Sequence, residues 1–317
     1  MRVMIRELAN TSRFQRERRP DDREQVSSPE RGVYSIRSIE DSKDPAIKKI
    51  HAVMVKEFGK EEAEALYWIR DTIKKDINRY HIAETPEGEI VAFSNTQYLE
   101  LEPASGRERE PRESIVPIWH IVSDRAHRNK GVASELYQNF YQDALVESQK
   151  RGNILKGIIG EAVSSVEGFL NRMGRKRMYF EDRAGNVHEI PYLCPPVDTD
   201  DRTGEPREDP MPEHVMLRLV NGDQKMPIED LLRMIKAMYL EYVGASDNYD
   251  TKEAYQNALK YNMRMLMNLA ETLQQSKDGS VFLMSRDQRE AKRRELERGK
   301  KKLIEVVTEA DEMGEGE

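Results

Sequence analysis

The chain has 317 residues, of which 38% are hydrophobic and 34% are charged, and its formal net charge is −7. This acidic balance argues against general nucleic-acid binding by the whole chain, and no apolar run approaches the roughly 18 residues of a membrane span. A single cysteine, Cys194, excludes an internal disulfide, and the N-terminus lacks the apolar centre of a secretory signal. A cytoplasmic protein is therefore predicted, with neither nucleic acid nor membrane as a partner.

Residues 1–31 are dense in arginine and acids and poor in apolar residues, which predicts a disordered N-terminal arm. An α/β domain is predicted for residues 32–222, because strand-like runs alternate there with amphipathic helical patterns. In chain order its expected elements are a strand at 33–39, helices at 44–58 and 61–77, a hairpin at 80–84 and 89–102, a strand at 114–122, a helix at 131–148, a strand at 154–159, a short helix from Ser164 or Ser165 to Gly174, and strands at 177–181, 187–193 and 214–220.

A helical extension is predicted for residues 223–308, followed by an acidic disordered tail at 309–317. Its helices are expected at 228–243, 252–275 and 285–307. Methionines and tyrosines recur there at helical spacing, which favours core or dimer packing, although a methionine-rich surface that adapts to partners is the other interpretation. The acidic loop at 195–212 is either a solvated loop or a surface that steers a cationic amine toward the protein.

The most informative stretch is a turn between the strand that ends at Val122 and the helix that follows. The unsatisfied amides and the macrodipole at a helix start favour the binding of a pyrophosphate. A glycine there lets the backbone approach a ligand closely. An ordinary strand-to-helix turn with a surface basic pair is the alternative. The turn has the pattern Arg-x-x-Gly-x-Ala, made of Arg128, Asn129, Lys130, Gly131, Val132 and Ala133.

Together with the order of strands and helices, the segment from Val122 to Ala133 closely resembles the acetyl-CoA motif of the GNAT superfamily of N-acetyltransferases. The resemblance covers about residues 33–220. It implies a GNAT-type mixed twisted sheet flanked by helices, which binds acetyl-CoA as a co-substrate and needs no metal. It also implies that the amides of the six turn residues hold the pyrophosphate. The pantetheine arm would pair with the backbone of Ile121, Val122 and Ser123 and enter a gap between this strand and the one that ends at Ile159.

The chain departs from the family pattern at several positions. Asp124 stands where a proline is common. In the helix after the last parallel strand, Leu170 occupies the place of a frequent tyrosine, and Arg175 that of an aromatic residue. A tyrosine that protonates the departing thiolate is therefore not expected at position 170, which leaves another group, water or a loss of activity.

Two residues are candidates for the catalytic base that removes a proton from the amine. Glu161 ends a predicted parallel strand, where a desolvated carboxylate would have a raised pKa; an exposed acid at a strand end is the alternative. His120 lies within a predicted strand and either faces the substrate cleft or is a satisfied core histidine. The histidines and Cys194 show no metal-ligand spacing, so no metal site is predicted. Cys194 is expected to be a small buried residue rather than a thiol at the site.

The sequence thus predicts an N-acetyltransferase that moves an acetyl group from acetyl-CoA to an amine by direct attack on the thioester. The alternative is a catalytically weak acyl-CoA-binding module that recruits a protein partner through its C-terminal helices. The acceptor would be an amine-bearing small molecule or a peptide, and a homodimer through the helical extension is one arrangement of the chain. The identity of the acceptor is left open, because acceptor specificity lies in variable loops.

Overall fold

A computed structural model of the chain describes residues 33–59, 63–106, 109–162, 167–196, 199–244, 246–285 and 287–292, together with Arg294 and Arg298. The predicted N-terminal arm at 1–31, the acidic tail at 309–317 and the helix start at Ser164 or Ser165 lie outside these residues, as does most of the predicted helix at 285–307. No helix in the described part of the chain is both long and apolar enough to cross a membrane.

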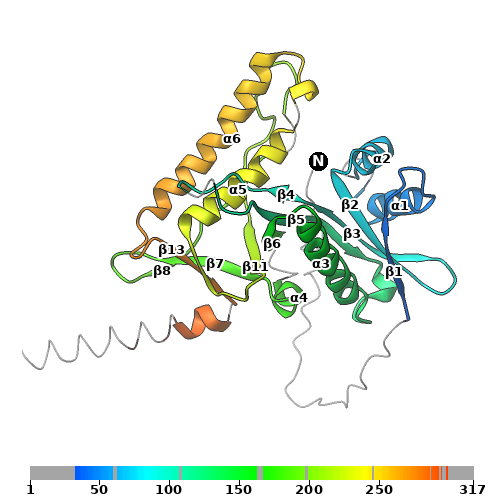
Figure 1. Cartoon of the computed structure of the whole chain (residues 1–317), viewed down its shortest axis with the longest axis horizontal. Coiled ribbons are helices and arrows are strands. Elements are labelled where there is room, and N and C mark those ends of the chain that lie inside the picture. Colours follow the sequence, from blue (N-terminus) through cyan, green and yellow to red (C-terminus); the bar gives the residue numbers. More distant parts are fainter. Residues whose placement is uncertain are drawn as a thin grey trace, which may run out of the picture.

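The elements follow the predicted order (Figure 1). The strands are β1 (Ser35–Ile39), β2 (Asn78–Glu84), β3 (Ile90–Gln97), β4 (Leu99–Glu100), β5 (Glu113–Ser123), β6 (Ile154–Ala162), β7 (Lys176–Glu181), β8 (Val187–Glu189), β9 (Leu193–Cys194), β10 (Met211–Pro212), β11 (His214–Leu219), β12 (Lys225–Pro227) and β13 (Ser280–Met284). The helices are α1 (Ala46–Phe58), α2 (Leu66–Lys74), α3 (Val132–Lys150), α4 (Glu167–Arg172), α5 (Ile228–Val243) and α6 (Lys252–Leu273), with short 3-10 turns at Arg125–His127 and Ser246–Asn248.

One mixed sheet carries the fold, with its strands in the order β1-β2-β3-β5-β6-β11-β7-β13-β12. Only β5 and β6 pair in parallel; the other neighbours along this path are antiparallel. The parallel connection needs a crossover, and α3 supplies it. Strand β11 enters between β6 and β7, so β6 has paired neighbours on both of its edges.

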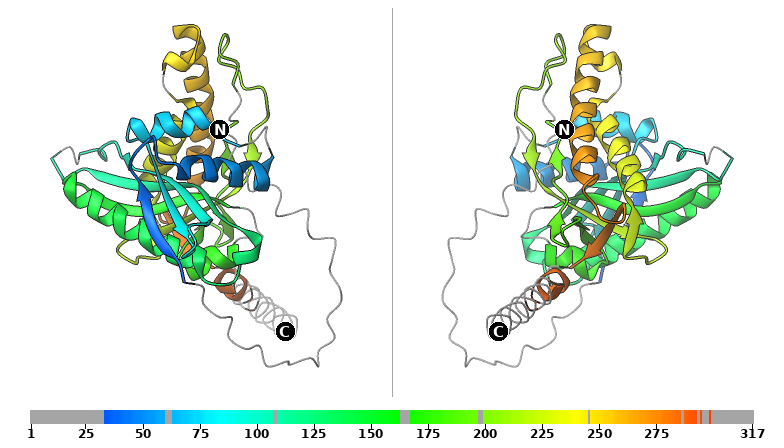
Figure 2. Two further views of the ribbon diagram at one scale, coloured as in Figure 1. Left: turned by 90° about the vertical axis from the view of Figure 1, so that its right-hand side faces the viewer. Right: turned by 90° about the vertical axis from the view of Figure 1, so that its left-hand side faces the viewer.

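Helices cover both faces of the sheet (Figures 1 and 2). On one face, α3 packs Tyr137, Phe140 and Tyr141 against β5 and β6. On the other face lie α1 and α2 over the β1–β3 end, and α5 and α6 over the end that contains β7 and β11. This mixed sheet between two helical layers confirms the predicted α/β fold class.

The C-terminal helices share one apolar core with the sheet. Met234 and Met238 of α5 are fully buried there, and Met265 of α6 is 8% exposed. These methionines therefore pack within the chain, although Met267 on α6 remains 62% exposed. Between the predicted helices at 252–275 and 285–307, β13 extends the sheet by pairing with β7 and β12, and no strand was predicted there. Its alternating pattern of only five residues was too short to be recognised.

Candidate acyl-CoA and proton-transfer site

The central feature of the site is the place where β5 and β6 separate. Their parallel pairing runs from Glu113 and Ile154 to Pro117 and Ile159. Beyond that point β5 continues against β3 alone, with Ser123 opposite Ala92, while β6 continues against β11. Pro117 has no N–H to give to a neighbouring strand, which suits the last residue of a paired stretch.

The separation leaves one edge of β5 without a strand partner. In the described part of the chain, nothing pairs with the β6-facing edge of β5 from Ile118 to Ser123. The predicted cofactor residues Ile121, Val122 and Ser123 lie in this segment. A strand edge with unpaired amides and carbonyls can accept an extended ligand by main-chain hydrogen bonds.

The predicted phosphate loop leads from this edge into α3. Gly131 is the N-cap of the helix with φ +90°, and Asn129 has φ +65°. Most residues with a side chain are strained at positive φ, whereas glycine adopts it freely and asparagine tolerates it. The N-cap glycine has no side chain with which to cap α3, and unsatisfied amides at a helix start favour an anion. The six predicted loop residues are thus brought together beside the β5 edge.

The charged side chains of the loop are held largely by the protein itself. Arg128 donates from Nε to the Ser123 carbonyl at 3.2 Å and from Nη2 to Glu57 of α1 at 3.0 Å. Asp124, at the position where the family favours proline, accepts from the Ala126 amide at 2.9 Å and from Lys56 at 2.7 Å. The loop is therefore anchored to α1, and its amides and the exposed Lys130 are the groups left for an anion.

Glu161 lies two residues beyond Ile159, the last residue of β6 that pairs with β5, and is only 6% exposed. Its Oε1 accepts a hydrogen bond from the Tyr192 hydroxyl, and its Oε2 accepts one from the Tyr242 hydroxyl at 2.6 Å. Burial raises the pKa of Glu161 above its ordinary value, and the two tyrosine hydrogen bonds oppose this shift. The predicted carboxylate base is thus desolvated, but it is enclosed by two phenols and is not an exposed strand-end acid.

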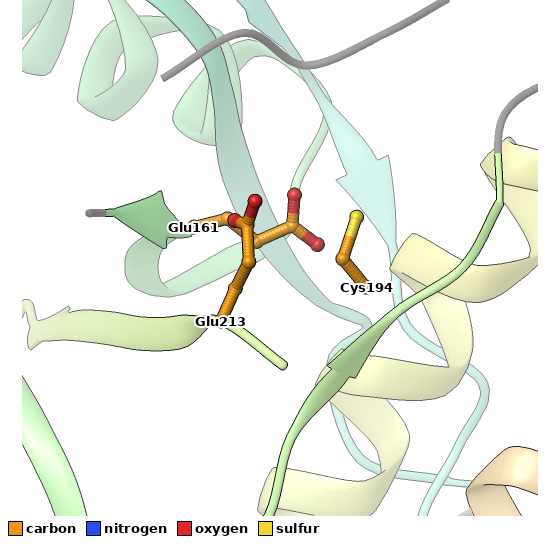
Figure 3. Close-up of side chains that lie close together, drawn as sticks. All are labelled: Glu161, Cys194 and Glu213. Carbon is orange, nitrogen blue, oxygen red and sulfur yellow. The ribbon is translucent and has the colours of Figure 1, made fainter. Parts of the chain in front are cut away.

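Cys194 and Glu213 complete the surroundings of Glu161 (Figure 3). One ligand atom of each of these three residues lies within 4.8 Å of the others. Each oxygen of Glu161 already accepts a hydrogen bond from a tyrosine hydroxyl. Burial also raises the pKa of Cys194, which keeps its thiol protonated. The cysteine is buried, as expected, and at the same time belongs to the site.

His120 belongs to a separate cluster on β5. Its Nε2 lies 3.3 Å from Oε1 of the buried Glu64, in the connection between α1 and α2. Tyr80 and Asn95 also donate to Glu64, at 2.6 and 3.1 Å. Burial raises the pKa of Glu64, but the contacts with His120 and Tyr80 more than offset this and leave it below its ordinary value. His120 therefore lies against a buried carboxylate and not in open solvent.

The aromatic groups near Glu161 come from segments that the sequence did not connect with the site. Leu170 is buried with Ala162 and Met216 under α4, away from the Glu161 cluster. The tyrosines at Glu161 come instead from the connection after β8 and from the end of α5. Sequence spacing could not reveal them, because Tyr242 continues an ordinary apolar helical face and Tyr192 stands in a short irregular segment.

No family model matches the chain, and no curated protein matches it. Among solved structures it is similar to NAA60 from Arabidopsis thaliana in complex with acetyl-CoA, with 11% identity over 60% of this chain and all of that one, at a TM-score of 0.40. An aminoglycoside acetyltransferase from an uncultured soil metagenomic sample shares 17% identity over 45% of this chain and 91% of that one, at 0.34. An acetyltransferase from Trypanosoma brucei shares 16% over 45% and 92%, at 0.33.

Proposed function

We propose that the chain is an acetyl-CoA-dependent N-acyltransferase that transfers an acetyl group to an amine by direct attack on the thioester. The observation that carries this proposal is the unpaired edge of β5 from Ile118 to Ser123, which leads directly to the uncapped start of α3 at Gly131. An extended arm with a pyrophosphate at one end matches that arrangement of donors. The resemblance of the loop to the GNAT acetyl-CoA motif supports the same ligand.

The residues of the chain fit the two ends of acetyl-CoA. The amides from Arg128 to Ala133 would bind the pyrophosphate, with Lys130 adding charge. The backbone of Ile121, Val122 and Ser123 would bind the pantetheine arm as an added strand. Bound in this way, acetyl-CoA supplies the acyl group as a thioester. The protein's own tasks are to position the amine and to accept its proton.

The acceptor side of the site is acidic and aromatic. Trp119 of β5 packs into the apolar core that α5 shares with the sheet, on the face opposite α3. Glu161 of β6 accepts a hydrogen bond from Tyr242 of α5. On the same face, Glu64 lies beside His120. Carboxylates around the separated strands favour a cationic acceptor. We therefore propose an amine-bearing small molecule or peptide as the acceptor.

A second candidate function is acyl-CoA binding without turnover. The enclosure of Glu161 by Tyr192 and Tyr242 favours it, because a base that cannot reach an amine cannot act directly. In that case the protein would bind acetyl-CoA and act through a partner. The same β5 edge and α3 start serve both functions.

A thiol-release assay with the full chain, acetyl-CoA and a panel of amines separates the two candidates. Cys194 is the only cysteine and is buried, so the protein itself adds little background. Sustained thiol release that falls in Glu161→Gln or His120→Ala supports the enzyme. Calorimetric binding of acetyl-CoA without release on any amine or peptide would establish the binding module, and an absence of binding would refute both.

A further inference from the structure

Glu161 requires an intermediary if it is to accept a proton from an amine. Its carboxylate is 6% exposed, and each of its oxygens already accepts a hydrogen bond from a tyrosine. Tyr192 is itself 2% exposed and Cys194 is 2% exposed. Tyr242, by contrast, is only partly buried. Of the two tyrosines that donate to Glu161, Tyr242 is thus the more exposed.

Tyr242 spans the separated strands. Trp119 and Glu161 each stand two residues beyond the last paired positions, Pro117 on β5 and Ile159 on β6. The ring of Tyr242 meets the Trp119 ring edge-on at 5.6 Å between centroids, and its hydroxyl donates to Oε2 of Glu161 at 2.6 Å. The Tyr242 side chain therefore contacts both diverging strands, on the face of the sheet opposite α3.

Neighbouring contacts hold this end of α5 in place. The Trp119 indole N–H donates to Oε1 of Gln97 at 3.0 Å, and the Gln97 amide donates to Glu241 of α5. The Cys194 thiol donates to the Tyr242 oxygen at 3.4 Å. A phenol has one proton to donate, which goes to Glu161, and its oxygen can accept a hydrogen bond from an amine in place of the weakly donating Cys194 thiol.

We propose that Tyr242 is a catalytic residue that relays the proton of the attacking amine to Glu161. This inference rests on the proposed acyltransfer. The amine nitrogen forms the C–N bond as the C–S bond breaks, and its proton moves to the Tyr242 oxygen while the Tyr242 proton moves to Oε2 of Glu161. Glu161 then returns a proton by the same path to the departing thiolate, so the amine proton ends on the thiol and both side chains are restored.

The two proton transfers are concerted because the alternatives are unfavourable. Burial raises the pKa of Tyr242 well above its ordinary value, so a free phenolate is disfavoured. Burial also raises the pKa of Glu161, which suits a group that must hold a proton transiently near neutral pH. A relay in which the phenol gains one proton as it loses another avoids a charged tyrosine.

The test compares Tyr242→Phe with Tyr239→Phe in the full chain. Tyr239 is the matched control, because it lies one turn earlier on α5 and its hydroxyl donates to the Leu193 carbonyl at 2.7 Å. Loss of a proton-transfer group typically lowers a rate by about 10²–10⁴-fold. We expect kcat to fall at least about a hundredfold in Tyr242→Phe, with the acetyl-CoA Kd unchanged, and to stay near that of the unmodified chain in Tyr239→Phe.

Two further measurements do not depend on the turnover rates of the tyrosine variants. In mixtures of light and heavy water, two protons in flight give a curved dependence of rate on deuterium fraction in the unmodified chain. Without substrate, the infrared carboxyl band that disappears in Glu161→Gln should shift in Tyr242→Phe and stay in place in Tyr239→Phe. A linear dependence, an unshifted band, or equal rates for the two tyrosine variants overturns the relay. Failure of the unmodified chain to turn over any amine instead overturns the proposed function, and the relay with it.

Discussion

Gly160 offers a sharp test of the separated strands as a ligand site. It is the first residue of β6 beyond the parallel pairing with β5. A Cβ atom added to it would lie 2.8 Å from the Ile118 carbonyl oxygen of β5 and 2.8 Å from Nη2 of the fully buried Arg175. The same Arg175 group donates to the Gly160 carbonyl at 2.8 Å, so neither neighbour can yield without disturbing the two strands. Gly160→Ala should therefore change the spacing where an acyl-CoA arm would enter.

Gly157 on the same strand provides the matched control. A Cβ atom there would lie 2.8 Å from the Arg218 carbonyl oxygen and 2.9 Å from a Leu217 methyl group, within the paired part of the sheet. Overpacking of this kind costs about 1–3 kcal/mol. With about 2–4 °C per kcal/mol for a chain of this size, both alanine variants should lower Tm by roughly 2–12 °C.

The two variants should differ in ligand binding. We expect Gly160→Ala to raise the Kd for acetyl-CoA, measured by calorimetry, more than about tenfold. A tenfold rise corresponds to a loss of about 1.4 kcal/mol in binding free energy. Gly157→Ala should keep the Kd of the unmodified chain, because its clash lies on the β11 side. If Gly160→Ala and Gly157→Ala lower Tm equally and also bind acetyl-CoA with equal affinity, the arm does not pass between β5 and β6.

Three further outcomes follow from the same structure. Gly131→Val should abolish acetyl-CoA binding. Gly88→Val, at a hairpin glycine of similar φ (+80° against +90°), should incur a comparable backbone strain of about 1–2 kcal/mol and still bind acetyl-CoA. Binding by both variants would count against the loop. Because burial raises the pKa of Glu161 above 4.5, its contribution to stability is full below that value and is lost as pH rises through the folded-state pKa. Measured by urea unfolding, Glu161→Gln should therefore become more stable relative to the unmodified chain as pH rises toward neutral. A parallel pH dependence of the two chains would contradict this. The pKa of Glu64 lies below 4.5, so its contribution to stability is present above that value and is lost as pH falls through the folded-state pKa. Glu64→Gln should therefore lower the free energy of unfolding by about 1–3 kcal/mol at neutral pH and by less in acid. An equal loss at both pH values would refute the pairing with His120.

Local pattern predicted the elements of the first two thirds of the chain because each is long or bounded by clear turn residues. The apolar strand before the turn, the amphipathic stripe of α3 and the glycine between them are local features. Gly131 needed no tertiary information, since a positive φ at a helix start is a local requirement that glycine meets. The short strands β12 and β13 were missed because they are defined by partners distant in sequence.

The chemistry around Glu161 could be predicted only in part for the same reason. The position of Glu161 at the end of β6 follows from the strand order, and so does its nearness to the separated strands. Its partners do not, because Tyr192, Cys194 and Tyr242 come from segments 31 to 81 positions later in the chain. No spacing rule connects residues that meet only after β11 has entered the sheet and α5 has packed over it.

The burial of Glu161 explains why the C-terminal helices are part of the site. A carboxylate removed from water is unfavourable unless donors replace its hydration, and Glu161 obtains them from Tyr192 and Tyr242. Tyr242 is held by α5, whose apolar face packs into the same core as the sheet. Removing α5 would therefore expose that core and leave the carboxylate without one of its donors. Leu170 packs with Ala162 and Met216 on one face of the sheet, whereas the Tyr242 phenol contacts the separated strands from the opposite face.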